Sequence, residues 1–364
     1  MIINTREAFQ IASQVDPTLE LSDTRLQRLN RRRILPSSYS RDALFSASAT
    51  GQTVVFSDFP SPVKTNRFTV GKTPEQSVIS AFRRARSKQK IRAKTGHQAI
   101  FKYFTLSDLI DKWHSERSIL NVTDFHFRDS SIENTVDAYP LSTFNLYPNT
   151  KDSIGDLEMM TLVISSRLGF SDSHSDDSDG SNHCFCGAKL WLAWETHEGI
   201  AAGLEDSDRQ TVTERCEFDM QTFLSLKSAH WFTVEKDQTL FMPGHLTHKV
   251  VTLSPYIGVG SFYLSFPNYL RTVTRWLLHE PNWEVLERNG YKQQAFRELF
   301  ALSARMRTRM DRISKQSRRQ WGWDFLPFAA DAWRREFSRS DRQRVLDDPV
   351  LTLPGSDFFR SLVA

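Results

Sequence analysis

Hydrophobic and polar positions change their pattern twice along this chain. Between residues 157 and 266, short apolar runs alternate with turn residues, a pattern typical of an all-β sandwich or barrel. A charged insertion over 196–238 interrupts these runs and contains a predicted helix over 219–227. The central part of the chain is therefore expected to be a β core. We predict its strands over 159–165, 189–195, 231–234, 239–242, 249–253 and 257–265.

Both flanks of this core have mainly helical periodicity. Before it, helices are predicted over 5–15, 73–94 and 105–113, with strands over 53–56 and 118–122. After Pro267, apolar residues recur about every 3.6 positions over 269–279, 291–312 and 329–337. The expected fold class is α+β with a mainly β core. We divide it into an N-terminal helical or irregular region, a β domain and a C-terminal helical region, over 1–104, 105–267 and 268–364.

Composition narrows the class of protein. The 364 residues are 39% hydrophobic and 12% aromatic, which suffices for a large folded core. The three cysteines are too few for a disulfide framework, so we expect an intracellular protein, cytoplasmic or nuclear. No apolar run approaches the roughly 20 residues of a membrane span, so no membrane is expected. The net charge of +4 is modest and does not require a nucleic-acid partner.

Three segments, over 25–34, 83–94 and 305–319, are rich in Arg and Lys. Basic runs on helices are most often solvent-exposed faces, and this is the simpler interpretation here. The basic helices also leave open a contact with an acidic partner. We expect the C-terminal helices either to cover the β core or to form a homodimer interface.

Residue types that bind metals gather inside the predicted β core. His174 and Asp176 are two positions apart, so on an extended segment both side chains point to the same side. A third ligand must come from another strand, and His248, at the start of a predicted strand, meets this need. Two histidines and one carboxylate suit non-haem iron(II) and leave positions open for co-substrate and oxygen. Asp177 and His245 are the competing ligands.

A lysine in the same region predicts an anionic ligand. Lys189 begins a predicted strand in which Leu190, Trp191 and Leu192 are all apolar, as in a strand buried on both faces. A buried lysine is costly unless it is paired, and the far carboxylate of a bound organic acid would pair it. The alternative is a lysine that simply points to solvent at the start of a strand.

Two other metal sites compete for the same stretch. DDSDG suggests a calcium loop, but an EF-hand needs an acid at its first position and Glu at its twelfth, where this chain has Ser175 and Cys186. His183, Cys184 and Cys186 suggest zinc, but C-x-C is not the usual spacing and no second cysteine pair follows. Both interpretations rank below iron.

Over about 110 residues, 157–266, the chain resembles the Jumonji C (JmjC) group of iron(II)- and 2-oxoglutarate-dependent oxygenases. The matching motifs are HSD at 174–176, GAK at 187–189 and LFMPGHLTHKV at 240–250. A proline usually stands five residues before the distal histidine of that family, as Pro243 stands to His248. The resemblance implies a double-stranded β-helix, or jelly roll, that binds iron(II), 2-oxoglutarate and O2.

The resemblance also implies roles for single residues. His174, Asp176 and His248 would be the iron ligands, and Lys189 would bind the distal carboxylate of 2-oxoglutarate. An Asn shortly after the acidic ligand recurs in the family, and Asn182 matches it. For the hydroxyl that helps to bind 2-oxoglutarate, the first choice is Thr161 and the second is Ser171.

The function that follows is oxidation of a C–H bond with release of succinate and CO2. The expected substrate is a small molecule or a protein side chain, and hydroxylation is the favoured outcome. A JmjC-type histone or protein lysine demethylase is an alternative, as are a non-enzymatic cupin-like binding protein and a zinc-dependent enzyme on a cupin barrel. Trp191, Phe185 and Tyr263 are candidates for the pocket wall, although each would serve equally in a plain core.

Overall fold

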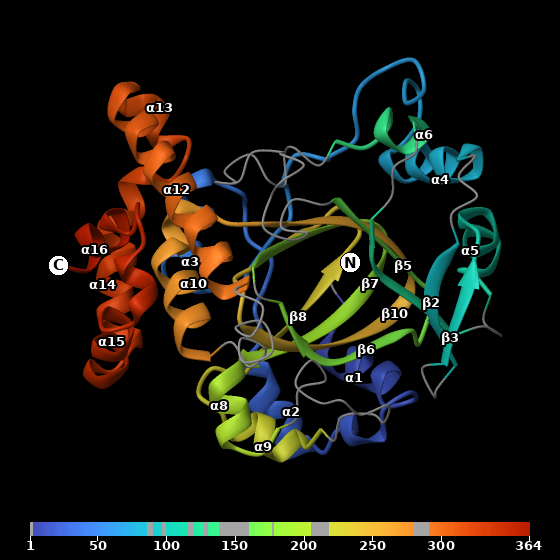
Figure 1. The fold of residues 1–364 in the computed structure, drawn as a ribbon. Coiled ribbons are helices and arrows are strands. Elements are labelled where there is room, and N and C mark those ends of the chain that lie inside the picture. Colours follow the sequence, from blue (N-terminus) through green and yellow to red (C-terminus); the bar gives the residue numbers. More distant parts are fainter. Residues whose placement is uncertain are drawn as a thin grey trace.

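The computed structural model describes residues 3–85, 90–96, 100–115, 119–126, 130–137, 160–176, 178–204, 218–279 and 291–364. Within these ranges the protein is an α+β fold, in which ten strands form one antiparallel sheet with helices before and after it. Figure 1 shows the strands at the centre and the C-terminal helices together on one side.

Short helices open the chain and pack beside the sheet. Their N-terminal N–H groups are capped by Asn4, Ser22 and Ser40, whose side chains accept hydrogen bonds from the first turn. Phe9 contacts Trp231 of the sheet edge-to-face, with ring centroids 5.2 Å apart. These elements are α1 (Thr5–Ala12), the 3-10 helix η1 (Pro17–Leu19), α2 (Asp23–Asn30) and α3 (Arg41–Ala49).

The basic segment over 83–94 differs from the prediction. Its helix ends at Arg84, and a β-hairpin follows instead of a longer helix. Ile91 and Ala93 alternate with polar residues and are buried by sheet neighbours that a local sequence window does not contain. The helix prediction is therefore wrong for residues 91–94, and 86–89 lie outside the described residues. The elements are α4 (Pro74–Arg84), β2 (Ile91–Thr95) and β3 (Ile100–Phe104).

The strands follow the order β1-β9-β7-β10-β5-β4-β2-β3, while β6 pairs with β10 and β8 pairs with β7 outside this path. The predicted strands of the β core all overlap these elements, and the predictions over 249–253 and 257–265 are two parts of one strand, β10. The second of these predictions extends two residues beyond the end of β10 at Tyr263, and Met159 lies outside the described residues. The other strands are β1 (Val54–Phe56), β4 (Leu120–His126), β5 (Met160–Ser165), β6 (Phe170–Ser175), β7 (Asp179–Glu195), β8 (His230–Glu235), β9 (Thr239–Met242) and β10 (Leu246–Tyr263).

Two long bent strands, β7 and β10, organise the sheet. The first half of β7 pairs with β9 and the second with β8, while β10 pairs first with β6 and then with β5. The β7–β10 register shifts between Thr252 and Gly258. At this level Gly187 has φ of +86°, and a Cβ there would lie 2.1 Å from the carbonyl oxygen of Pro255. The bend thus requires glycine. It divides the paired strands into two groups that share β7 and β10, one in the order β8-β7-β10-β6 and the other in the order β9-β7-β10-β5.

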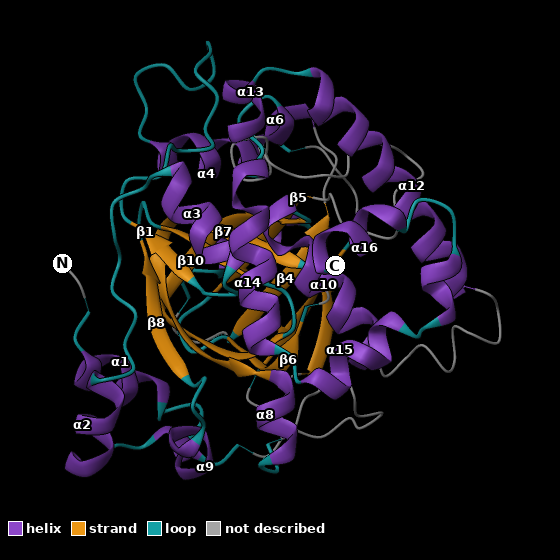
Figure 2. Ribbon diagram, turned by 90° about the vertical axis from the view of Figure 1, so that its left-hand side faces the viewer, coloured by secondary structure: helices purple, strands orange, loops and turns teal. Residues whose placement is uncertain are grey.

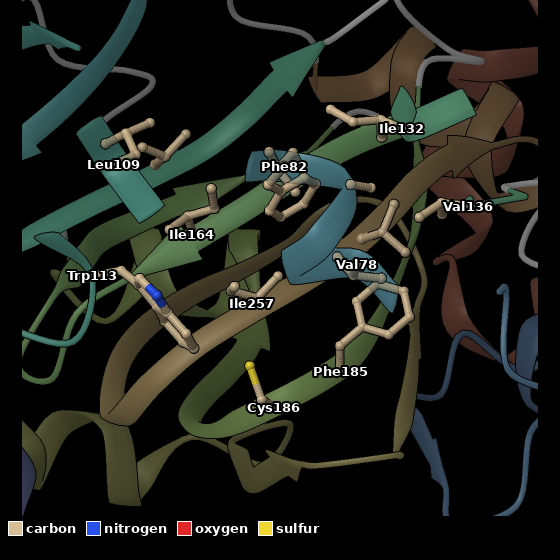
Figure 3. Packing of buried hydrophobic residues seen from close by; sticks show 14 of the residues in the cluster. Val78, Phe82, Leu109, Trp113, Ile132, Val136, Ile164, Phe185, Cys186 and Ile257 are labelled. Carbon is tan, nitrogen blue, oxygen red and sulfur yellow. The ribbon is translucent and has the colours of Figure 1, made fainter. Parts of the chain in front are cut away.

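Three helices cover part of the sheet: α4, α5 (Leu106–Lys112) and α6 (Ser130–Glu133). The first belongs to the predicted N-terminal region and the other two to the predicted β domain. Figure 3 shows Val78 and Phe82 of α4 in one apolar layer with Ile164, Phe185 and Ile257 of the strands. Each of these side chains is at most 1% exposed. Residues of the predicted N-terminal region therefore share a core with the predicted β domain.

The C-terminal helices have an apolar core of their own, in which Tyr269, Phe300 and Phe359 are fully buried. Figure 2 shows α10 and α14 lying in front of the strands. No helix within the described ranges is both long enough and apolar enough to span a membrane. The helices after β7 are α8 (Thr196–Ala201), α9 (Met220–Ser225), α10 (Phe266–His279), α12 (Tyr291–Arg312), α13 (Lys315–Arg319), η2 (Trp323–Phe325), α14 (Leu326–Glu336), α15 (Arg339–Leu346), η3 (Pro349–Thr352) and α16 (Asp357–Val363).

Two arginines of α10 join these helices to the sheet. Arg271 contacts Glu195 at the end of β7, and its Nε lies 3.0 Å from Oε1 of Glu336. Nη2 of Arg275 lies 2.9 Å from Oε2 of Glu195 and 2.6 Å from Oε1 of Glu336. Burial acts to raise the pKa of Glu336, but the two guanidinium groups outweigh it and leave that pKa below its ordinary value of 4.5.

Candidate active site

The two predicted histidine ligands stand opposite each other on neighbouring strands. His174 of β6 and His248 of β10 are register partners, and their ring centroids are 4.2 Å apart. Asp176 follows the end of β6, with its Oδ2 3.9 Å from Nε2 of His248. The antiparallel pairing of β6 with β10 therefore brings together the three residues predicted from two separate motifs.

Backbone carbonyl groups orient both imidazole rings. Nδ1 of His174 donates to the carbonyl oxygen of Asp172 at 2.6 Å, and Nδ1 of His248 donates to that of Leu246 at 3.1 Å. Since a carbonyl only accepts, these bonds place the proton on Nδ1 and leave a lone pair on each Nε2. Burial, and then the neighbouring His174, lower the pKa of His248 well below 6.5. His248 is therefore a neutral donor near neutral pH.

The donor set suits a transition metal, but the side chains are not drawn together around one. Among the described residues, no group of three His, Cys, Asp or Glu side chains is placed to hold a metal ion. Two ligands at right angles around an ion about 2.1 Å away lie roughly 3 Å apart. The 3.9 Å between Asp176 and His248 exceeds this by less than an ångström.

Lys189 extends into the same cavity from β7 and is 2% exposed. Its Nζ donates to Oδ1 of Asn121 at 3.4 Å and lies 5.1 Å from the ring centre of Tyr256. Asn121 is itself fixed, because its Nδ2 donates to Oγ of Ser171 at 3.0 Å and its Oδ1 accepts from Ser165 at 2.7 Å. The interpretation of Lys189 as a solvent-facing strand start is wrong.

Thr161 and Asn182 line the cavity from the strands on either side of β10. Both are register partners of Gly260, where a Cβ would lie 2.2 Å from the carbonyl oxygen of Ser181 and 3.1 Å from Oγ1 of Thr161. Oδ1 of Asn182 accepts a hydrogen bond from the hydroxyl of Tyr256. A side chain at 260 would therefore collide with the backbone of β7 and with Thr161 of β5.

One cavity contains all six predicted site residues. Its volume is about 590 Å³, including the part that is open to solvent. The structure thus brings together Thr161, His174, Asp176, Asn182, Lys189 and His248. Its wall is completed by Thr123, Val163, Ser171, Gly180, Ser181, Trp191, Leu240, Met242, Val250 and Phe262.

Of the two competing ligands, only His245 belongs to the described residues. His245 does not line the cavity, although its backbone N–H donates to the carbonyl oxygen of Asp176 at 2.7 Å. Asp177 lies outside the described residues. Of the three aromatic candidates for the wall, Trp191 lines the cavity, with its ring centroid 5.3 Å from that of His248, whereas Phe185 and Tyr263 belong to the apolar core beneath α4.

The cysteines are poor candidates for a zinc site. Cys184 and Cys186 are buried, and Sγ of Cys184 donates to the carbonyl oxygen of Cys186 at 3.2 Å. Burial raises the pKa of the Cys186 thiol to about 12 and that of Cys184 well above 9.0. Their surroundings therefore favour the protonated thiol, whereas zinc binds thiolates.

Several polar residues of the site were not anticipated from the sequence. Asn121 and Tyr256 each contact a predicted site residue, and Lys249, on the far side of β10, forms ion pairs with Asp16 at 2.9 Å and Asp172 at 3.1 Å. Tyr256 lies between two runs that were predicted as separate strands. No local pattern therefore indicated that Tyr256 belongs to a continuous strand β10. For Lys249, the apolar strand around a lysine is the same signal that pointed to Lys189.

Comparison with known proteins gives no further support, because neither a family model nor a curated protein matches this sequence.

Proposed function

We propose that this protein is an iron(II)- and 2-oxoglutarate-dependent oxygenase of JmjC type that oxidises a C–H bond of a small molecule or a protein side chain. The observation that carries the proposal is the meeting of HSD, GAK and the distal histidine in one cavity. Residue chemistry and spacing singled out His174, Asp176, Lys189 and His248, and the resemblance to the JmjC group added the motifs around them. A plain β core gives no reason for two oriented histidines, a carboxylate and a buried lysine to share a cavity.

Each site residue has a proposed role that follows from its position in the cavity. His174, Asp176 and His248 would hold iron(II), whose chemistry is to couple decarboxylation of 2-oxoglutarate to oxidation of the substrate. Lys189 would bind the distal carboxylate as a charge-assisted pair, with Asn121 holding its ammonium group in place. Thr161 and Asn182 would supply hydrogen bonds to 2-oxoglutarate between the metal ligands and Lys189. Trp191 would exclude water beside His248.

The strand pairing supports a finer description of the fold. A four-strand group and a second group share the bent strands β7 and β10, and they would form the two faces of a double-stranded β-helix. We therefore propose that the sheet is a JmjC-like jelly roll, with the cavity between its faces.

The test is release of succinate from 2-oxoglutarate by the full-length protein, with iron(II), O2 and a panel of peptides and small molecules. His174→Ala, Asp176→Ala and His248→Ala are each expected to abolish turnover and to weaken binding of cobalt(II), followed by its visible absorption. His245→Asn is the matched control, because it changes a histidine three residues from His248 outside the cavity. Normal turnover in any of the three ligand variants would refute that ligand.

A second candidate is a non-enzymatic cupin-like binding protein. It is favoured by the finding that the described His, Cys, Asp and Glu side chains form no group placed to hold a metal. Such a protein would bind a carboxylate ligand through Lys189 and would bind it equally well with iron(II) removed. Calorimetry of 2-oxoglutarate binding with and without iron(II) distinguishes the two, because the oxygenase requires the metal for tight binding.

A further inference from the structure

Within the part of the chain that the structure describes, strand β3 is an edge of the sheet. Among the described residues it pairs with β2 alone and ends the strand order. Figure 1 shows it on the side of the molecule opposite to the C-terminal helices. Four of its five residues are exposed, including Ile100 at 54%, Phe101 at 44% and Tyr103 at 65%. An edge strand also presents every second backbone N–H and C=O to solvent.

The hairpin that carries this edge is basic. Arg92 and Lys94 of β2 stand opposite Tyr103 and Phe101, so cations and aromatic rings share one face. The guanidinium carbon of Arg92 lies 3.5 Å from the ring centre of Phe101. The described residues 90–96 and 100–104 contain four Lys or Arg and no Asp or Glu. The edge therefore combines apolar contact area with positive charge.

These features do not fit an edge that is protected only against aggregation. Protective edges use charge, proline or short length, and they do not expose several large apolar side chains. A second copy of the chain is also a poor partner, because pairing two such edges would place cations against cations. The charge calls for a partner that is negative.

We propose that the β3 edge is a docking site for an extended, acidic segment of a partner protein, which adds a strand to the sheet. Backbone hydrogen bonds to β3 would provide affinity. Arg92, Lys94, Phe101 and Tyr103 share one face and would select acidic side chains at every second position, while Ile100 on the other face would contact the apolar side chains between them. A nucleic acid would use the rings and the cations but would leave the open backbone row of β3 without partners. The open row therefore favours a peptide.

This site is separate from the cavity. With strands about 4.8 Å apart, an added strand would lie roughly 15 Å from β4, which carries Thr123 of the cavity wall. The docked segment would thus recruit a partner and would not present the group that reacts. The proposal holds whether or not the cavity is an oxygenase site.

Fluorescence anisotropy of a labelled peptide that alternates Glu and Val tests the proposal with the full-length protein. We expect binding that weakens as salt is raised, because the pairing is partly electrostatic. Tyr103→Ser and the double variant Arg92→Glu, Lys94→Glu should each weaken binding about tenfold or more. Phe328→Ser is the matched control, since Phe328 is 62% exposed on α14, and it should bind as the parent does.

Two further probes separate strand addition from other modes. A peptide of the same sequence, N-methylated at alternate residues along one edge, lacks the N–H groups that a strand needs and should lose binding. Equal binding of this peptide, or tighter binding of a single-stranded oligonucleotide of equal charge, would overturn the proposal. Absence of measurable binding by the unmodified peptide would overturn it as well. Thermal unfolding of each variant checks that the hairpin still folds.

Discussion

Two lysines of the same sheet are both 2% exposed but have different surroundings. Lys249 forms ion pairs with two aspartates of the protein, whereas Lys189 lines the cavity beside Asn121. The argument that a buried lysine needs an anion applies equally to both. A buried lysine in an apolar strand therefore does not by itself indicate a ligand site, and it is the cavity at Lys189 that makes the difference.

Lys189→Ala is expected to raise the 2-oxoglutarate concentration needed for half-maximal turnover by about thirtyfold or more. Truncating one member of a buried charge pair costs about 2 kcal/mol or more, and each 1.4 kcal/mol is about a tenfold change. Lys72→Ala, at an exposed position, should leave this concentration unchanged. An unaltered dependence on 2-oxoglutarate in the Lys189 variant would exclude the ion pair.

Lys249→Met should lower the free energy of unfolding by about 3–5 kcal/mol, because it leaves the buried Asp172 and the partly buried Asp16 without their cation. Since the carbonyl of Asp172 orients His174, cobalt(II) binding should weaken as well. Urea unfolding measures the first effect and metal titration the second. The triple variant Lys249→Met, Asp16→Asn, Asp172→Asn should recover part of the stability. A loss below about 1 kcal/mol in the single variant would show that the pairs matter little.

At the scale of elements, periodicity located half of the described α-helices and most of the described strands, but not their connections. Helix α12 matches its predicted range of 291–312, and β9 matches 239–242. The prediction split β10 at Ser254 and Pro255, where turn residues break the apolar pattern. The strand continues through them because β7 bends at the same level and keeps pairing with it. A local window contains only one of the two partners, so it indicates a break where the structure has a bend.

Asp179 links three elements where β7 begins. Its Oδ1 accepts hydrogen bonds from the N–H of Gly244, at 3.1 Å, and from the amide of Asn268 in α10, and its Oδ2 accepts from Ser265 at 3.4 Å. Burial outweighs these bonds and the charge of Arg271, and raises the pKa of Asp179 to about 6. The folded protein therefore binds this proton more tightly than the unfolded chain does.

The raised pKa predicts a defined pH dependence of stability. The contribution of Asp179 is complete below about pH 3.8 and is lost as the pH rises through about 6. The loss amounts to about 3 kcal/mol, from about 2.2 pKa units at about 1.36 kcal/mol each. Asp179→Asn mimics the protonated group, so its unfolding free energy relative to the parent should rise by about this amount between about pH 4 and about pH 7. Urea unfolding across this range measures it, and parallel profiles would contradict the assignment.

At the scale of the whole molecule, the C-terminal helices cover the sheet through α10, in line with one of the two predicted arrangements. The predicted homodimer interface stays a prediction. Not all basic side chains of these helices face solvent. Arg271 and Arg275 are less than a tenth exposed, and they neutralise Glu195 and Glu336. Contact between the two parts of the molecule thus depends on buried charge as well as on apolar packing.

Arg271→Met is expected to lower the free energy of unfolding by about 2–3 kcal/mol. This is the lower part of the range for a broken buried pair, since both glutamates are about a quarter exposed and Arg275 still pairs with them. The Arg-rich C-terminal helices should also be cut faster by trypsin, because their docking is weakened. Arg334→Met, which loses an exposed ion pair with Asp331, is the control and should change neither measurement appreciably. Equal digestion of the Arg271 variant and the parent would show that apolar contacts alone hold the helices.

The candidate site was predictable in its residue types and only partly in its members. Residue spacing singled out His174, Asp176, Lys189 and His248, because i, i+2 geometry and a lysine in an apolar strand are local signals. Asn121 carries no such signal, since its contact with Lys189 joins residues 68 positions apart. The preference for His248 over His245 also gained a physical basis only from the register of β10 with β6.

By itself the sequence determined the periodic elements, the mainly β character of the centre and the chemical types able to bind a metal and an anion, because these depend on neighbours along the chain. Tertiary structure decided that those types meet in one cavity, that residues 91–94 form a strand rather than a helix, and that Lys249 is neutralised within the protein. The reason is physical: strand register, burial and charge pairing depend on neighbours in space, and no local pattern specifies which distant strand supplies them.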